Sequence, residues 1–132
     1  MKLQHGEYIS YGRIESVLKT SPLVENICVL ADPTQDYCKA IIVPSVPELE
    51  SMTNLDAKEA IKTTEVQTKV AQSLEKYGQD MGLCKVECPK KVLLTLDEWT
   101  PDSGLVTAAF KIRRRFVSQK YASELQKLQI DC

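Results

Sequence analysis

Residues 99–115, with the sequence WTPDSGLVTAAFKIRRR, constrain the chain most, because turn chemistry and dense positive charge adjoin there. Pro101 fixes its own φ and Gly104 permits a positive φ, so we expect a turn or loop around these residues. Thr107 is a suitable N-cap, and we expect the last helix to follow over about residues 108–128. The apolar residues expected on the inner side of this helix are Ile112, Phe116, Leu125 and Leu128.

Four cations stand within five residues at the expected start of that helix, namely Lys111, Arg113, Arg114 and Arg115. A helix N-terminus already carries partial positive charge, so cations are disfavoured there. One interpretation is an anion site that combines the side-chain charges with free backbone N–H groups. The other interpretation is a solvated basic face, and charge alone leaves both open.

Composition limits the kind of anion. The chain has 132 residues, enough for one domain with a core, and its net charge is -1. A general nucleic-acid binder needs an excess of cations, so we expect no nucleic-acid partner and favour a compact anion. No apolar run is long enough to span a membrane, so we expect no membrane segment.

The cysteine pattern predicts neither a disulfide nor a metal site. The five cysteines are Cys28, Cys38, Cys84, Cys88 and Cys132, an odd number with irregular spacing. Cys84 and Cys88 lack a second pair that would complete a tetrahedral zinc site, and the single histidine, His5, is far away in sequence. We therefore expect free thiols in a reducing compartment and no bound metal.

Apolar periodicity predicts an α+β fold, with a small sheet of about three strands flanked by helices and an N-terminal β-hairpin. The expected hairpin covers residues 2–9 with its bend at Gly6, and Ser10 caps a helix over about 11–20. The predicted strands are 24–30, 39–43 and 90–96, the first two antiparallel in a sheet covered on both sides. The other predicted helices are 55–62, capped by Asn54, and about 64–80, ending near Gly78 and Gly82; residues 44–50 are a connector.

Several familiar catalytic arrangements are missing from the sequence. No glycine-rich loop precedes a Lys-Ser or Lys-Thr pair, and no nucleophile elbow is present. Asp97 and Glu98 are adjacent, so they point in different directions and do not form a carboxylate pair. The sequence holds no complete active site; Lys111 remains as a candidate cation and Gly6 as the bend of a candidate loop.

Two end motifs carry a resemblance to a known family. KLQHGEYIS followed by RIE, and WTPDSGLVT followed by AFKIRRR, resemble the long-chain acyl-CoA synthetases, which are adenylate-forming enzymes. The resemblance is to the C-terminal domain alone and covers residues 1–132, with the middle matching only in layout. It implies that the family's large N-terminal AMP-binding domain, which holds the ATP phosphate loop and the fatty-acid tunnel, is absent here.

The resemblance assigns roles in two poses of a mobile domain. In the first pose Lys111 would contact the fatty acid carboxylate and the α-phosphate of ATP. In the second pose the N-terminal hairpin would replace it, with Gly6, Glu7 and Tyr8 on the CoA side. Glycine suits that place because it has no Cβ to obstruct the pantetheine arm of CoA. Without the resemblance, Gly6 would be explained as a turn residue.

Other assignments stay open. Arg113, Arg114 and Arg115 could reach CoA phosphates, or face the partner domain or solvent. Most of the superfamily has glycine before the catalytic lysine, whereas Phe110 stands there in this chain, and the long-chain synthetases resemble it in this respect. His5 could titrate near neutral pH beside the bend, but a role for it in deprotonating CoA is unsupported by the sequence.

The resemblance implies a long-chain fatty acid–CoA ligase that uses ATP, Mg2+ and CoA and joins CoA to a fatty acid. Its partner would be its own N-terminal domain, on the cytoplasmic side of the endoplasmic reticulum or mitochondrial outer membrane, and the isolated fragment would be soluble, inactive and free of cofactor. Two alternatives remain. One is a non-catalytic interaction module that binds an anionic ligand or partner through the basic helix start, and the other is an adenylating enzyme with a different acceptor, such as a carrier protein.

Overall fold

The computed structural model describes residues 10–31, 38–84, 87–109 and 111–125. The hairpin expected over residues 2–9 lies outside the described residues. The chain packs as two compact units, Met1–Leu96 and Asp97–Cys132, and each is described here by itself.

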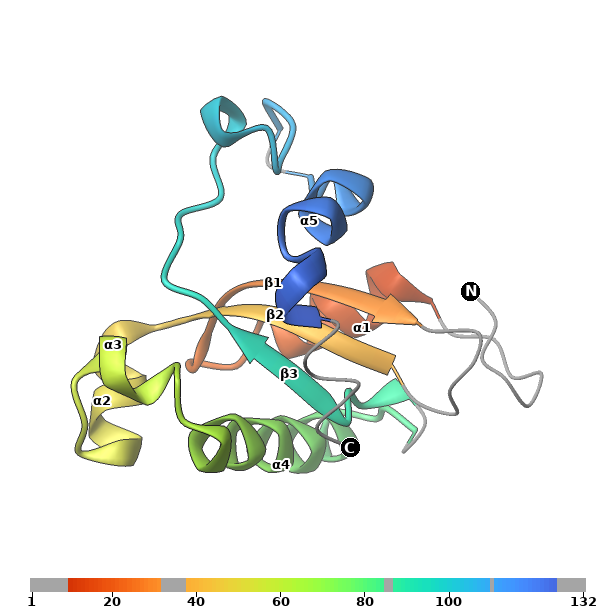
Figure 1. Cartoon of the computed structure of the whole chain (residues 1–132). Helices are drawn as coiled ribbons and strands as arrows, with labels where there is room; N and C mark the ends of the chain where they lie inside the picture. Colours follow the sequence, from red (N-terminus) through yellow and green to blue (C-terminus); the bar gives the residue numbers. More distant parts are fainter. Residues whose placement is uncertain (1–9, 32–37, 85–86, 110, 126–132) are drawn as a thin grey trace. The chain divides into compact units, whose positions relative to one another are not determined.

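The first unit is built on a mixed three-stranded sheet (Figure 1). Its strands are β1 (Val24–Ala31), β2 (Cys38–Pro44) and β3 (Lys91–Leu94), in that spatial order. β1 and β2 are antiparallel, and β2 and β3 are parallel. The predicted α+β class and its three strands are confirmed. The parallel pair requires a long crossover, which the helices between β2 and β3 supply.

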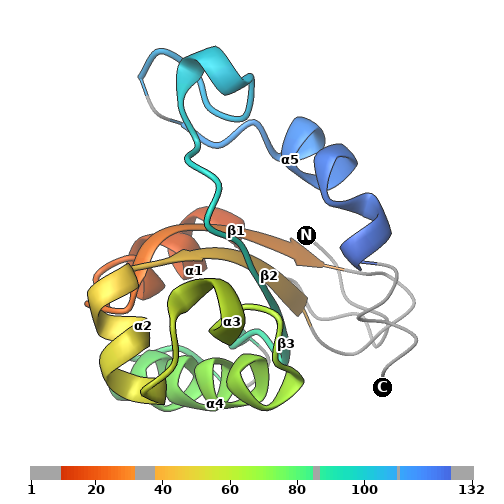
Figure 2. The ribbon, with the colours of Figure 1, turned by 60° about the vertical axis from the view of Figure 1, so that its left-hand side comes forward.

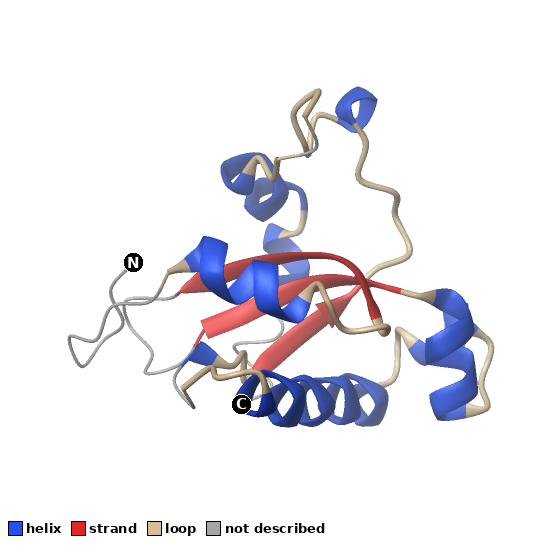
Figure 3. Ribbon diagram, turned by 180° about the vertical axis from the view of Figure 1, so that it is seen from behind, coloured by secondary structure: helices blue, strands red, loops and turns tan. Residues whose placement is uncertain are grey.

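Helices α1 (Tyr11–Leu18) and α4 (Thr64–Asp80) pack on one face of this sheet (Figure 3). Ser10 caps α1 as predicted, because its hydroxyl oxygen accepts a hydrogen bond from the Arg13 N–H at 3.4 Å. Paired residues of the three strands, on the face toward these helices, form the part of the core that the sheet contributes. The buried residues of this core include Ile14, Leu18, Ile27, Val29, Ala40, Ile42, Val66, Val70, Leu74, Val92 and Leu94.

Apolar side chains on the other face of the sheet are also buried. Cys28, Ile41 and Leu93 stand in one row across the three strands and are all buried. All seven residues of β2 are buried. Apolar residues on both faces of the sheet are therefore buried, as their pattern in the sequence predicted.

The stretch after β2 was predicted wrongly as a connector. Val46–Thr53 form a helix, α2, with a proline in its first turn, where the missing N–H costs no hydrogen bond. Asn54 ends α2 in the left-handed conformation, with φ 58°, instead of starting the next helix. That helix, α3, is shorter than predicted, covers Ala57–Ala60, and lies beside α2 (Figure 2).

The second unit differs most from the prediction. The helix expected over 108–128 from Thr107 begins only at Arg114, and α5 covers Arg114–Lys120. Thr107 caps no helix, because its hydroxyl accepts a hydrogen bond from the Lys111 N–H within a hairpin. Phe116, predicted to face inward, is 44% exposed, whereas Val117 and Tyr121 are buried. Leu128 lies outside the described residues.

Candidate functional site

Lys111 stands in a narrow antiparallel hairpin, residues 105–113, which we call the Lys111 hairpin. The Thr107 N–H donates to the Lys111 carbonyl at 2.9 Å, and the Lys111 N–H donates back to the Thr107 hydroxyl oxygen at 3.1 Å. Val106 and Ile112 pair below them, and the Arg113 N–H donates to the Leu105 carbonyl at 2.9 Å. The backbone N–H and the carbonyl of Lys111 itself are therefore both held by hydrogen bonds.

The base of the Lys111 hairpin is buried and its lysine is exposed. Leu105 and Val106 retain only 3% and 2% of their accessible surface. They belong to the second unit, in which Trp99, Val117 and Tyr121 are the other buried apolar residues among those described. Lys111 is exposed at the other end of the hairpin. This arrangement presents an ammonium group to solvent on a long stem from a fixed base.

The turn predicted around Pro101 and Gly104 is confirmed. Pro101–Ser103 form a 3-10 helix that begins with reciprocal hydrogen bonds between Thr100 and Ser103. Gly104 ends it with φ 79°, a conformation that side chains with a Cβ rarely adopt. The turn delivers the chain directly into Leu105, the first residue of the Lys111 hairpin.

The three arginines do not act as one group. The Arg113 guanidinium stacks over the Phe116 ring at 4.0 Å from its centroid, and Arg113 is the N-cap residue of α5. Arg114 and Arg115 occupy the first turn of α5, so the unfavourable placement of cations at a helix start is confirmed for these two. Lys111 precedes the helix and belongs to the Lys111 hairpin.

The residues expected on the CoA side, Gly6, Glu7 and Tyr8, lie outside the described residues, together with His5 and Phe110. Their roles stay predictions. The structure thus describes the lysine half of the expected site.

The described cysteines, Cys28, Cys38, Cys84 and Cys88, are free thiols. Burial raises the pKa of the Cys38 thiol to about 12 and that of the Cys88 thiol to about 11. Both thiols are therefore neutral at physiological pH and poor nucleophiles. Within residues 10–31, 38–84, 87–109 and 111–125, no three His, Cys, Asp or Glu side chains are grouped to hold a metal ion.

Sequence reasoning missed one group of hydrogen-bonded side chains in the second unit. Trp99 Nε1–H donates to the Tyr121 hydroxyl at 3.2 Å, and the Tyr121 hydroxyl donates to Asp97 Oδ2 at 2.8 Å. These partners are separated by 22 and 24 residues, so no local pattern identifies them. The sequence indicated only that Asp97 and Glu98 do not form a carboxylate pair.

No described helix combines the length and the apolar character that crossing a lipid bilayer requires.

Comparison with known proteins identifies relatives along the whole chain, although no family model matches it. Long chain acyl-CoA synthetase 8 of Arabidopsis thaliana is 44% identical over 134 residues, which cover 97% of this chain and 19% of that protein. Long-chain-fatty-acid–CoA ligase 1 of Schizosaccharomyces pombe is 35% identical over 133 residues, covering 95% of this chain and 20% of the ligase. The chain therefore spans about a fifth of the length of these relatives.

A solved structure shows the same fold. The A domain of carboxylic acid reductase from Segniliparus rugosus superposes with a TM-score of 0.83 at 27% identity, over 99% of this chain and 20% of that domain. The mixed three-stranded sheet with its helices matches the C-terminal domain of adenylate-forming enzymes. By its sequence and by this fold, the chain belongs to the long-chain acyl-CoA synthetases, as the part that corresponds to their C-terminal domain.

Proposed function

We propose that the intact protein is a long-chain fatty acid–CoA ligase in which residues 1–132 form the C-terminal domain. It would convert fatty acid, ATP and CoA to acyl-CoA, AMP and pyrophosphate. The 44% identity to a long chain acyl-CoA synthetase supports this activity. The remaining four fifths of such a protein would supply the AMP-binding domain, which is the partner of this one. The fragment alone would then be inactive.

The single observation that carries the proposal is the presentation of Lys111. It is an exposed cation on a hairpin whose base is buried, and its own backbone N–H and carbonyl are both hydrogen-bonded. A carboxylate and a phosphate repel each other as an acyl-adenylate forms. A positioned ammonium group between them stabilises the negative charge of the transition state. Lys111 is therefore the residue we assign to the adenylation step.

In the second pose we assign the CoA side to Gly6, Glu7 and Tyr8, as the family resemblance implies. Arg113, Arg114 and Arg115 are the candidates for contacts with CoA phosphates, and the Arg113 guanidinium stacks over the Phe116 ring. ATP would bring Mg2+ through its phosphates, and such a site typically adds one or two protein carboxylates. We place these carboxylates, the ATP site and any membrane attachment in the rest of the protein.

The reductase comparison favours a second candidate function, in which the acyl-adenylate is passed to an acceptor other than CoA. The solved A domain carries AMP and a co-purified carboxylic acid, and it shares this fold at a TM-score of 0.83. Lys111 would have the same role in that enzyme. Measuring thioester formation with CoA supplied as the only acceptor separates the two candidates.

The test is to compare half-reactions in the intact enzyme carrying this domain. Lys111→Ala should slow adenylate formation by on the order of a hundred- to a thousand-fold, because a preorganised electrostatic contact is lost. Thioester formation from synthetic acyl-adenylate and CoA should continue, because the lysine is turned away in that pose. Lys69→Ala removes an exposed lysine from α4 and is the matched control; it should leave both half-reactions unchanged.

Gly6→Leu is the reciprocal variant and should have the opposite effect. Its side chain would crowd the pantetheine path, so thioester formation should fall while pyrophosphate release by adenylation survives. If Lys111→Ala and Gly6→Leu lose both half-reactions equally with folding intact, the assignment of these two residues to separate poses is wrong.

A further inference from the structure

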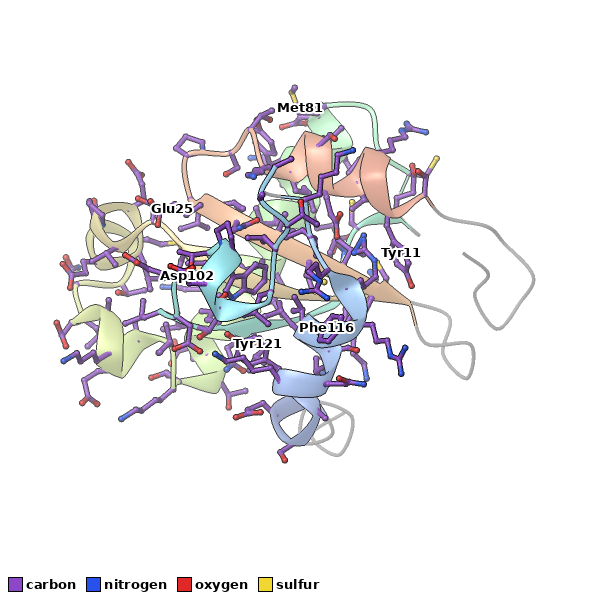
Figure 4. All side chains as sticks on the ribbon, turned by 90° about the horizontal axis from the view of Figure 1, so that it is seen from above. Tyr11, Glu25, Met81, Asp102, Phe116 and Tyr121 are labelled. Carbon is purple, nitrogen blue, oxygen red and sulfur yellow. The ribbon has the colours of Figure 1, made fainter. Side chains whose placement is uncertain are left out.

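The second unit contains a network of hydrogen-bonded and charged side chains to which the proposed function assigns no role. The network consists of Asp97, Trp99, Lys120 and Tyr121, and we call it the Tyr121 network. Tyr121 and Trp99 are each 5% exposed, and their ring centroids are 6.3 Å apart at an interplanar angle of 42°. Tyr121 directly follows α5, the helix that also carries Phe116 (Figure 4).

The Tyr121 hydroxyl stands at the centre of this network. It accepts the Trp99 Nε1–H at 3.2 Å and donates its own proton to Asp97 Oδ2 at 2.8 Å. The Lys120 ammonium lies 3.7 Å from the same carboxylate oxygen and 5.7 Å from the Tyr121 ring centroid. One hydroxyl thereby joins two side chains that precede the Lys111 hairpin to a residue that follows it.

The network joins the two ends of the segment that carries Lys111 by hydrogen bonds. The arm before the hairpin runs from Asp97 through Trp99 and the 3-10 helix to Leu105. The arm after it continues directly into α5, since the Phe116 and Val117 N–H groups both donate to the Arg113 carbonyl. Tyr121 lies at the end of this second arm and bonds to the start of the first. The segments that lead into and out of the Lys111 hairpin are therefore joined through the same hydroxyl group.

We infer that Tyr121, through its hydroxyl, is a positioning residue that holds Lys111 in place for adenylation, with Asp97 and Trp99 as its partners. The inference rests on the proposed role of Lys111. Without the hydroxyl the two arms lose their shared hydrogen bonds, and the Lys111 ammonium is distributed over more positions. A displacement of about 1 Å in a catalytic geometry can cost about a hundred-fold in rate.

The test uses Tyr121→Phe in the intact enzyme, which keeps the buried ring and removes only the hydroxyl. We expect the kcat of adenylate formation to fall about ten- to a hundred-fold, with the KM for ATP and fatty acid unchanged. Thioester formation from synthetic acyl-adenylate and CoA should be unchanged. Tyr77→Phe is the matched control, because it also removes a hydrogen-bonded hydroxyl but from α4 in the first unit, and it should leave adenylation unchanged.

A second pair of variants decides the matter if Tyr121→Phe does not fold. Asp97→Asn keeps an oxygen that accepts the tyrosine proton, so adenylation should stay close to wild type. Asp97→Ala removes that acceptor and should reproduce the kcat loss. Equal adenylation in these two variants, or a kcat loss shared by both half-reactions, would overturn the inference.

Lys111→Ala, measured alongside, separates this inference from the proposed function. If Lys111→Ala abolishes adenylation while Tyr121→Phe leaves its kcat intact, the positioning role is wrong and the proposed function stands. If Lys111→Ala leaves adenylation intact, the role assigned to Lys111 fails, and the positioning role of Tyr121 fails with it.

Discussion

At the scale of single residues, Gly78 shows how closely the first unit is packed. It lies in the last turn of α4, near the helix end that was predicted there, and it is buried. A Cβ at this position would come within 3.0 Å of Leu83 Cδ1, 3.2 Å of Cys88 Sγ and 3.3 Å of Leu18 Cδ2. The absence of a side chain therefore lets three neighbours approach the helix.

Gly78→Ala should lower the free energy of unfolding by about 1 kcal/mol. Overpacking costs about 2 kcal/mol, and the better helix propensity of alanine offsets about 1 kcal/mol of it. Gly12→Ala in α1 is the control, because no atom lies within 4 Å of its added Cβ, and it should raise stability by about 0.5 kcal/mol. Urea unfolding of both variants measures the difference. A Gly78→Ala variant that is more stable than wild type would show that the neighbouring side chains move aside at little energetic cost.

At the scale of elements, the outer edge of β1 is protected by side chains. Glu15 on α1 accepts a hydrogen bond from the Val29 N–H at 2.7 Å, and Asn26 accepts one from the Ile27 N–H at 2.9 Å. β1 is an edge strand of the sheet, and an edge with free N–H groups invites pairing with another chain. Helix α1 therefore covers the core and also protects the sheet edge.

Glu15→Ala should lower the free energy of unfolding by about 1–3 kcal/mol, because the buried Val29 N–H loses a charged acceptor. It should also promote self-association, which sedimentation velocity measures as a function of concentration. Glu15→Gln keeps an oxygen acceptor and should show less than half of the stability loss. Equal losses for the two variants would mean that the side-chain oxygen is not what stabilises the edge.

At the scale of the whole molecule, the chain divides into two units whose hydrophobic cores differ in size, so we expect them to differ in stability. The first unit contains the large core between the sheet and helices α1 and α4. The second, Asp97–Cys132, is shorter than the roughly 40 residues below which isolated domains usually need disulfides, metals or a partner. Its described core is small, around Trp99 and Tyr121.

We expect the second unit to open at lower denaturant concentration than the first. Trp99 is the single tryptophan, so its fluorescence reports the second unit, while far-UV circular dichroism is dominated by the helices of the first. The fluorescence midpoint in urea should therefore precede the circular dichroism midpoint. Coincident transitions would show that the two units unfold as one.

Local sequence by itself determined most elements of the first unit. Short apolar runs predicted all three strands, and the spacing of Val66, Val70 and Leu74 predicted α4, because strand and helix patterns depend on near neighbours. Residues 44–50 were predicted as a connector because Pro47 suggested that no helix forms there. Proline is compatible with the first turn of a helix, but the sequence does not show that α2 starts just before Pro47.

Tertiary structure alone decided how Lys111 is presented. The family motif singled out the lysine, whereas Thr107 as an N-cap and the spacing of the apolar residues after it predicted a helix around it. Burial of Leu105 and Val106 and the pairing of Val106 with Ile112 favour a hairpin instead, because packing outweighs weak local preference. The hydrogen bonds that close this segment join Tyr121 to Trp99 and Asp97 across more than twenty residues, a separation over which sequence periodicity carries no information.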